Sequence, residues 1–133
     1  MRVISMQIEH ATSENIPDKV VWRSLKNLIE RFKFTEAEAL TLMGAMARST
    51  YYKGLKTYNA GLTRDQRDRV SYLLGIYKNL RILFIDSEQA MSWINRPNDL
   101  APFNGLSPKD YLLEGSLSRL EHVRRFLDFW RGY

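Results

Sequence analysis

The chain has 133 residues, of which 44% are hydrophobic and 26% charged, with a formal net charge of +5; this length favours one domain or two small units sharing a core. The absence of cysteine excludes disulfides, thiolate metal sites and thiol nucleophiles. Ser5 and Gln7 interrupt the N-terminal apolar residues, and no stretch reaches the ~20 apolar residues of a membrane span. We therefore expect a soluble, cytoplasmic protein without a membrane partner.

The first predicted element is an N-terminal arm over residues 1–16, where apolar and polar residues alternate only weakly. Pro17 suits the first turn of a helix, because its missing N–H has no partner there in any case. Apolar residues then recur at three- and four-residue steps, which predicts an amphipathic helix. Its apolar positions are Val21, Leu25, Leu28, Ile29 and Phe32.

A helix–turn–helix is predicted next, within an N-terminal unit over residues 17–60. Thr35 and Glu38 form a capping-box pattern that opens a short helix. Gly44 ends it, and a second helix is expected over 47–56. In a DNA-binding version the second helix enters the major groove, with polar residues on base edges and cations on phosphates. The candidate DNA-binding residues are Arg48, Ser49, Thr50, Tyr51, Lys53 and Lys56.

A purely structural interpretation of this segment stays open. Two short helices separated by a glycine are common in helical proteins, and Tyr51 or Tyr52 then belongs to the core. Leu40 lies four residues before Gly44, where many bacterial regulators have alanine. A net charge of +5 is compatible with nucleic-acid binding but does not establish it.

The longest helix is expected after Gly61, with Thr63 as its N-cap. Its apolar stripe either lies in the core or serves a homodimer, and arginines 64, 67 and 69 with Lys78 are expected largely off the stripe. The stripe comprises Val70, Leu73, Leu74, Tyr77, Leu80 and Phe84.

Three further helices are predicted before the C-terminus. A short one is expected over 88–94, then a loop over 95–106, and Ser107-Pro108 has the cap-plus-proline pattern of another helix start. The last helix carries Leu117, Leu120, Val123, Leu127 and Trp130. Strand signals are almost absent. The predicted fold is all-α: a helical bundle with an N-terminal helix–turn–helix unit and a C-terminal helical unit over 61–133.

Catalytic patterns find little support in this sequence. Neither His10 nor His122 belongs to a metal-ligand spacing, and the Gly-x-x-x-x-Gly-Lys phosphate loop is absent. No general base can be assigned to a serine nucleophile. We therefore expect no enzyme activity, no cofactor and no metal.

The C-terminal half carries a resemblance to a known family. Trp93 closes a short helix, a Pro-Asn loop follows, and Phe103-Asn104-Gly105-Leu106-Ser107-Pro108 opens the next helix. This order, together with the runs 62–81 and 123–132, closely resembles the Xre/MbcA/ParS antitoxin family over about residues 35 to 133. The resemblance implies that 61–133 contains a toxin-binding domain. It further implies a RES-domain toxin that destroys NAD as partner, and repression of the operon through operator DNA.

The final helix is where we expect toxin contact. Leu120, Val123, Leu127 and Trp130 are predicted to pack inward, which leaves Phe126 and Phe129 on a different side. Aromatic residues and arginine are enriched as interface anchors, and guanidinium groups suit the entrance of an NAD-binding cleft, where they pair with acidic residues. The candidate toxin-binding residues are Arg124, Arg125, Phe126, Phe129, Trp130, Arg131, Gly132 and Tyr133.

Alternatives from other classes remain at this point. The C-terminal arginines can instead form a solvated face that stabilises the helix C-terminus. The whole chain can be a stand-alone helix–turn–helix transcription factor whose C-terminal half only dimerises, or a structural adaptor.

Overall fold

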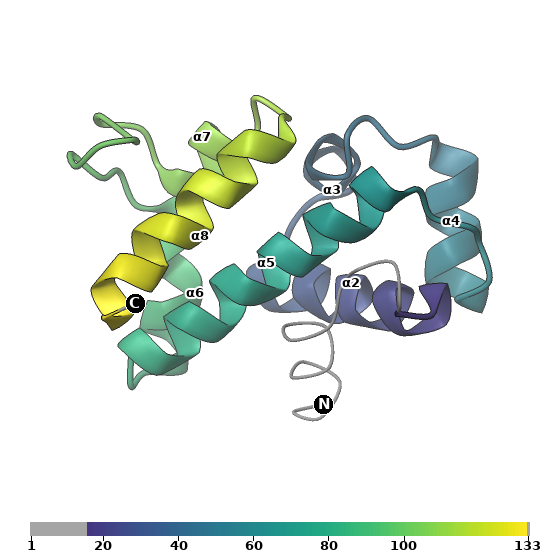
Figure 1. Cartoon of the computed structure of the whole chain (residues 1–133), viewed down its shortest axis with the longest axis horizontal. Helices are drawn as coiled ribbons and strands as arrows, with labels where there is room; N and C mark the ends of the chain where they lie inside the picture. The colour runs from purple at the N-terminus through teal and green to yellow at the C-terminus, as the bar shows by residue number, and fades with distance from the viewer. Residues whose placement is uncertain (1–15, 133) are drawn as a thin grey trace.

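The computed structural model describes residues 16–132, and within this range it contains seven α-helices, one short 3-10 helix and no strand (Figure 1). The predicted all-α class is confirmed. The predicted N-terminal arm lies outside the described residues except for Ile16. No helix in the described part of the chain is both long and apolar enough to cross a bilayer.

The N-terminal unit contains three helices: α2 (Asp18–Phe32), α3 (Glu36–Leu42) and α4 (Arg48–Thr57). The expected capping box at the start of α3 is present, since Thr35 and Glu38 each bond the other's backbone N–H. The turn between α3 and α4 passes through positive φ at Gly44 and Ala45, +76° and +59°, a backbone conformation that glycine adopts without strain.

Helix α5 (Arg64–Leu83) crosses the molecule and meets both units. Thr63 caps it, as predicted, in a second capping box with Gln66. Its apolar stripe belongs to the core: Val70, Leu73, Leu74 and Leu80 are buried, and Tyr77 and Phe84 are partly buried and pack against the core. The core interpretation of this stripe is therefore confirmed.

Helix α8 (Leu117–Arg131) lies beside α5 and runs in the same direction (Figure 1). The cross-helix bonds keep one register, because Tyr72 meets Glu121 and Asn79 meets Asp128, each pair 49 residues apart in sequence. Gly75 lies between them, and a Cβ there would be 2.5 Å from the Arg124 guanidinium. The two helices thus approach closely at this glycine.

The remaining elements are α6 (Ser87–Ser92), η2 (Trp93–Asn95) and α7 (Pro108–Leu112), with the loop 96–107 between the last two. Helix α6 packs against α5, whereas η2, the loop and α7 pack against α8. The cap predicted at Ser107 is present, and Asp86 caps α6 in the same way. Phe103 is 1% exposed and fills the core beneath the loop. Gly105, at φ +99°, donates its N–H to the Asn98 carbonyl and helps to close the loop.

One expectation about α5 is wrong. Arg69, predicted to lie off the apolar stripe, is 7% exposed and packs between the two units. Its guanidinium donates to the carbonyl of Leu42 at 3.0 Å and to that of Gly115 at 2.7 Å. It also pairs with Asp65 at 2.7 Å. Burial is tolerated because the charge is paired and the N–H groups find acceptors.

Candidate functional site

Helix α4 exposes most of the residues predicted to contact DNA. Arg48, Ser49, Lys53 and Lys56 are exposed and Thr50 is half-buried. Tyr51 is only 5% exposed and lies in the hydrophobic core, so its ring is on the far side of the helix from the lysines. The core alternative considered for Tyr51 is the one that the structure supports.

Of the two α3 carboxylates, Glu36 lies beside this exposed face and Glu38 faces α7. Glu36 accepts a hydrogen bond from the Tyr52 hydroxyl and lies 3.9 Å from the Arg48 guanidinium. Burial, together with the negative charge of Glu36, raises the pKa of Tyr51. Glu38 forms an ion pair with Lys109 of α7 at 3.0 Å. Burial raises the pKa of Glu38, but the Thr35 N–H bond and Lys109 outweigh it, so the net pKa is lowered.

Helix α8 turns part of its polar side toward α5. Arg124 pairs with Asp128 at 3.8 Å. Arg131 donates to the side-chain oxygen of Asn79 at 2.8 Å, and Asn79, 1% exposed, donates to Asp128 at 2.8 Å. Among the predicted toxin-binding arginines, Arg131 therefore holds α8 against α5, and Arg124 lies beside Gly75 of α5 while it pairs within its own helix. Arg125 differs: its side chain is 76% exposed and pairs only at the surface, with Glu121 at 2.9 Å.

The predicted side-chain orientations of two aromatic residues on α8 are wrong. Phe126, expected to point away from the core, packs against Trp93 and Phe103 with ring centroids 6.0 and 5.0 Å away. Trp130, expected to pack inward, is 55% exposed, and Phe129 is 72% exposed as predicted. The reason is that α8 packs against η2, α7 and the loop as well as α5. Its apolar arc is therefore wider than one stripe, and Trp130 lies in the last turn, at the edge of that packing.

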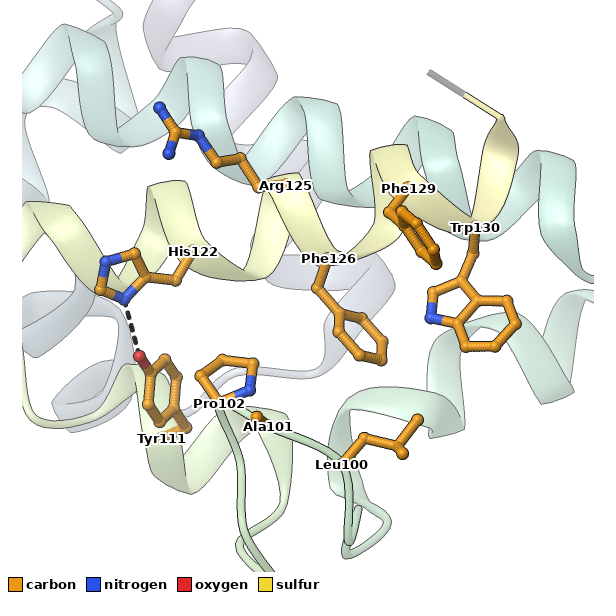
Figure 2. Close-up of a pocket in the computed structure, with 9 residues that line it drawn as sticks. All are labelled: Leu100, Ala101, Pro102, Tyr111, His122, Arg125, Phe126, Phe129 and Trp130. Carbon is orange, nitrogen blue, oxygen red and sulfur yellow. Dashed lines mark hydrogen bonds between the residues drawn. The ribbon is translucent and has the colours of Figure 1, made fainter.

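A groove of about 670 Å³ lies between α8 and the loop (Figure 2). Phe126, Phe129 and Trp130 line it from α8, and Leu100 and Pro102 line it from the loop. One end is polar, since the Tyr111 hydroxyl and the His122 ring nitrogen Nδ1 are 2.7 Å apart there. Arg125 also lines the groove, but its guanidinium points away from the hollow (Figure 2).

Sequence reasoning did not find the loop side of this groove. Helical periodicity ranks residues within a helix, but it gives no position for a loop relative to that helix. The available signal was Leu100-Ala101-Pro102, a run of apolar residues in a loop otherwise rich in polar residues. Gly132 ends α8 at φ +94°, and Tyr133 lies outside the described residues.

Comparison with known proteins gives two family matches and one relative. Residues 12–75 match the antitoxin Xre-like helix–turn–helix domain. Residues 79–132 match the antitoxin Xre/MbcA/ParS C-terminal toxin-binding domain. An uncharacterized protein, y4oB, of Sinorhizobium fredii is 38% identical over 105 residues, which is 79% of each chain. The two matched ranges meet within α5, and the second contains every residue that lines the groove.

Proposed function

Because the chain belongs to the Xre/MbcA/ParS antitoxin family, we propose that it binds and neutralises a RES-domain toxin that degrades NAD and represses its own operon. The observation that carries the proposal is the exposed end of α8, where Phe129 and Trp130 lie within the range matched by the toxin-binding domain. Large exposed aromatic side chains are favoured anchors at protein interfaces, because burying them removes much apolar area from water.

The α8 residues divide into two roles in this proposal. Arg125, Phe129, Trp130 and Gly132 contact the toxin directly, and Tyr133, which lies outside the described residues, is assigned to the same contact. Arg131 and Phe126 hold the helix in place through Asn79 and the aromatic cluster, and Arg124 is directed toward α5 rather than toward the toxin. Neutralisation follows if the docked C-terminus covers the entrance to the NAD cleft.

Deletion of Phe129–Tyr133 is expected to abolish neutralisation. Co-expressed with the product of the adjacent toxin gene, the full chain should co-purify with it and keep cellular NAD near its normal level. The truncated chain should do neither, because the exposed anchors are lost. The deletion also removes the Arg131 bond to Asn79, so retained operator binding and a cooperative thermal transition must show that it still folds. Full neutralisation by a folded truncated chain would contradict the proposed role of this end.

Repression is assigned to the exposed face of α4. Lys53 and Lys56 lie one turn apart on it, and Arg48 and Ser49 lie at the helix N-terminus. In a helix–turn–helix, cations at such positions meet phosphates, while polar residues near the N-terminus meet base edges. The proposed DNA-contacting set is thus the predicted one with Tyr51 moved to a supporting role in the core.

Each of the substitutions Lys53→Gln and Lys56→Gln is expected to weaken binding to operator and unrelated DNA alike. Loss of one phosphate contact should lower the slope of log affinity against log salt by about 1 per bound protomer. Arg81→Gln, which removes the same charge from an exposed position near the C-terminal end of α5, serves as the control and should leave the slope unchanged. Fluorescence anisotropy over a salt series measures all three. Equal slopes in every variant would exclude this face.

A homodimer is also part of the proposal, because operators commonly repeat a half-site with two-fold symmetry. The apolar stripe of α5 is occupied by the core. Ile82 and Ile85, exposed by 57% and 103% at the end of α5, are apolar positions that a second copy can cover.

A stand-alone regulator is the competing function. It predicts salt-sensitive DNA binding in a chain that forms no complex with the adjacent gene product. Co-purification with that product therefore separates the two functions directly.

A further inference from the structure

The groove beside α8 is built from elements that lie far apart in sequence. Its floor is fixed, because Phe126 packs edge-on against the fully buried Phe103. Phe129 and Trp130 stand along the helix side and Leu100 along the loop side, facing one another across the hollow (Figure 2). A volume of about 670 Å³ lies in the range of sites that hold small molecules or a few side chains.

The apolar surface continues past the groove. A second hollow of about 330 Å³ shares Leu100, Phe126 and Trp130 with the first and extends to Leu83 and Phe84 at the end of α5. Leu100 and Trp130, the shared rim, are 52% and 55% exposed. Exposed apolar side chains that gather in this way mark interaction surfaces more often than single exposed residues do.

Arg125 lines the polar end of the groove, and its guanidinium points away from the hollow (Figure 2). Arg125 pairs with Glu121, but that carboxylate also accepts a bond from Tyr72 at 3.4 Å. Glu121 therefore keeps a hydrogen-bond donor when Arg125 turns away. His122 is exposed at the same end and is held by Tyr111. A carboxylate that enters here meets the His122 imidazole, and Arg125 can turn its guanidinium from Glu121 toward it to form a charge-assisted bond, which is stronger than a neutral one.

We propose that this groove receives a short apolar segment of the toxin that carries an acidic residue. The apolar side chains fill the space between Leu100, Pro102 and Trp130, and the acidic residue pairs with Arg125. This rests on the proposed function. The groove proposal goes beyond that function, because it assigns the loop 98–102 and the Tyr111–His122 end to the interface and gives the chemistry of the toxin segment.

Two features favour the toxin over other occupants. All the lining residues lie within the range matched by the toxin-binding domain, so the groove is continuous with the surface assigned to the toxin. DNA does not fit, because its binding is dominated by phosphate contacts and the groove walls are largely apolar.

The test changes the loop side and leaves α8 intact. Affinity for the purified product of the adjacent toxin gene is measured by biolayer interferometry. Leu100→Glu is expected to lower it at least 100-fold, because it places a carboxylate on the shared apolar rim. Leu106→Glu is the matched control, since Leu106 lies in the same loop, is 47% exposed and lines neither hollow. It should bind within twofold of the original chain. Arg125→Gln should cost about 10-fold at low salt and less at high salt.

The outcomes separate this inference from the proposed function. If the unchanged chain does not bind the toxin, the proposed function fails. If it binds and Leu100→Glu binds equally well, only the groove assignment fails. If Leu100→Glu keeps its toxin affinity but converts a dimer into a monomer, as measured by light scattering, the occupant is a second copy and the inference is overturned. A thermal melt of each variant confirms that the exposed substitutions leave the fold intact.

Discussion

Gly54→Ala is expected to lower the free energy of unfolding by about 3 kcal/mol, although alanine is normally the better helix former. A Cβ at this position in α4 would lie 2.1 to 2.3 Å from three atoms of the Trp22 ring. Alanine usually stabilises a helix interior by about 1 kcal/mol relative to glycine. Overpacking of a filled core costs about 1 to 3 kcal/mol and sometimes more, and here the overlap is severe.

The Trp22 ring cannot easily move to relieve this overlap. It is fully buried, and its indole N–H donates to the carbonyl of Ala60 at 2.7 Å. Either that bond breaks or α4 shifts away from α2, so operator binding should fall as well. Urea denaturation measures the loss of stability, and the thermal midpoint should drop by about 10 °C.

Gly75→Ala is the matched control for this prediction. Its Cβ would also be too close to a side chain, at 2.5 Å, but the neighbour is the guanidinium end of Arg124. That end can swing aside, so we expect a change within about 1 kcal/mol, partly offset by the helix propensity of alanine. Equal effects of the two substitutions would show that the fixed Trp22 ring is not the cause.

Arg69→Met is the second substitution with a large expected effect, a loss of about 3 kcal/mol in the free energy of unfolding. Methionine is similar in length but donates no hydrogen bond. The carbonyls of Leu42 and Gly115 then lose the bonds that Arg69 gives them. Asp65 loses its ion pair but is half exposed, so water compensates it in part.

Two control substitutions separate the effect of the Arg69 charge from the effect of its buried position. Arg69→Lys keeps the charge but not the planar set of donors that reaches three acceptors, so it should be intermediate. Arg64→Met removes an exposed arginine from the same helix, 4.0 Å from Asp68, and should cost less than about 1 kcal/mol. If Arg69→Met is no more costly than Arg64→Met in chemical denaturation, the carbonyl contacts are not important for stability.

The helices could be predicted because their signals are local. Thr35 with Glu38, and Thr63 with Gln66, satisfy the first backbone N–H groups from within four residues. Ser107-Pro108 begins α7 for a similar reason. The predicted positions of the Trp130 and Arg69 side chains were wrong for the opposite reason. Spacing shows which residues share a face of a helix, but the neighbours that cover that face come from elsewhere in the chain.

The candidate surfaces were predictable to different degrees. The exposed side of α4 follows from its position after the turn at Gly44, although burial of Tyr51 required the tertiary packing. Phe129 could be assigned from the excess of aromatic residues on α8. The presence of Leu100 and His122 in one groove could not be predicted, because it depends on how the loop 96–107 lies against α8.

The path of α5 limits how this protein can be recombined. The helix begins within the range matched by one family domain and ends within the range matched by the other. It is therefore shared by the two domains. Arg69 lies in its first half yet bonds Gly115, two residues before α8 begins, while Asn79 in its second half anchors the end of α8. A chimera that joins this DNA-binding half to another antitoxin's toxin-binding half must carry over a matched α5–α8 pair. We therefore expect new toxin specificity to arise by substitutions on the α8 surface rather than by exchange of whole domains.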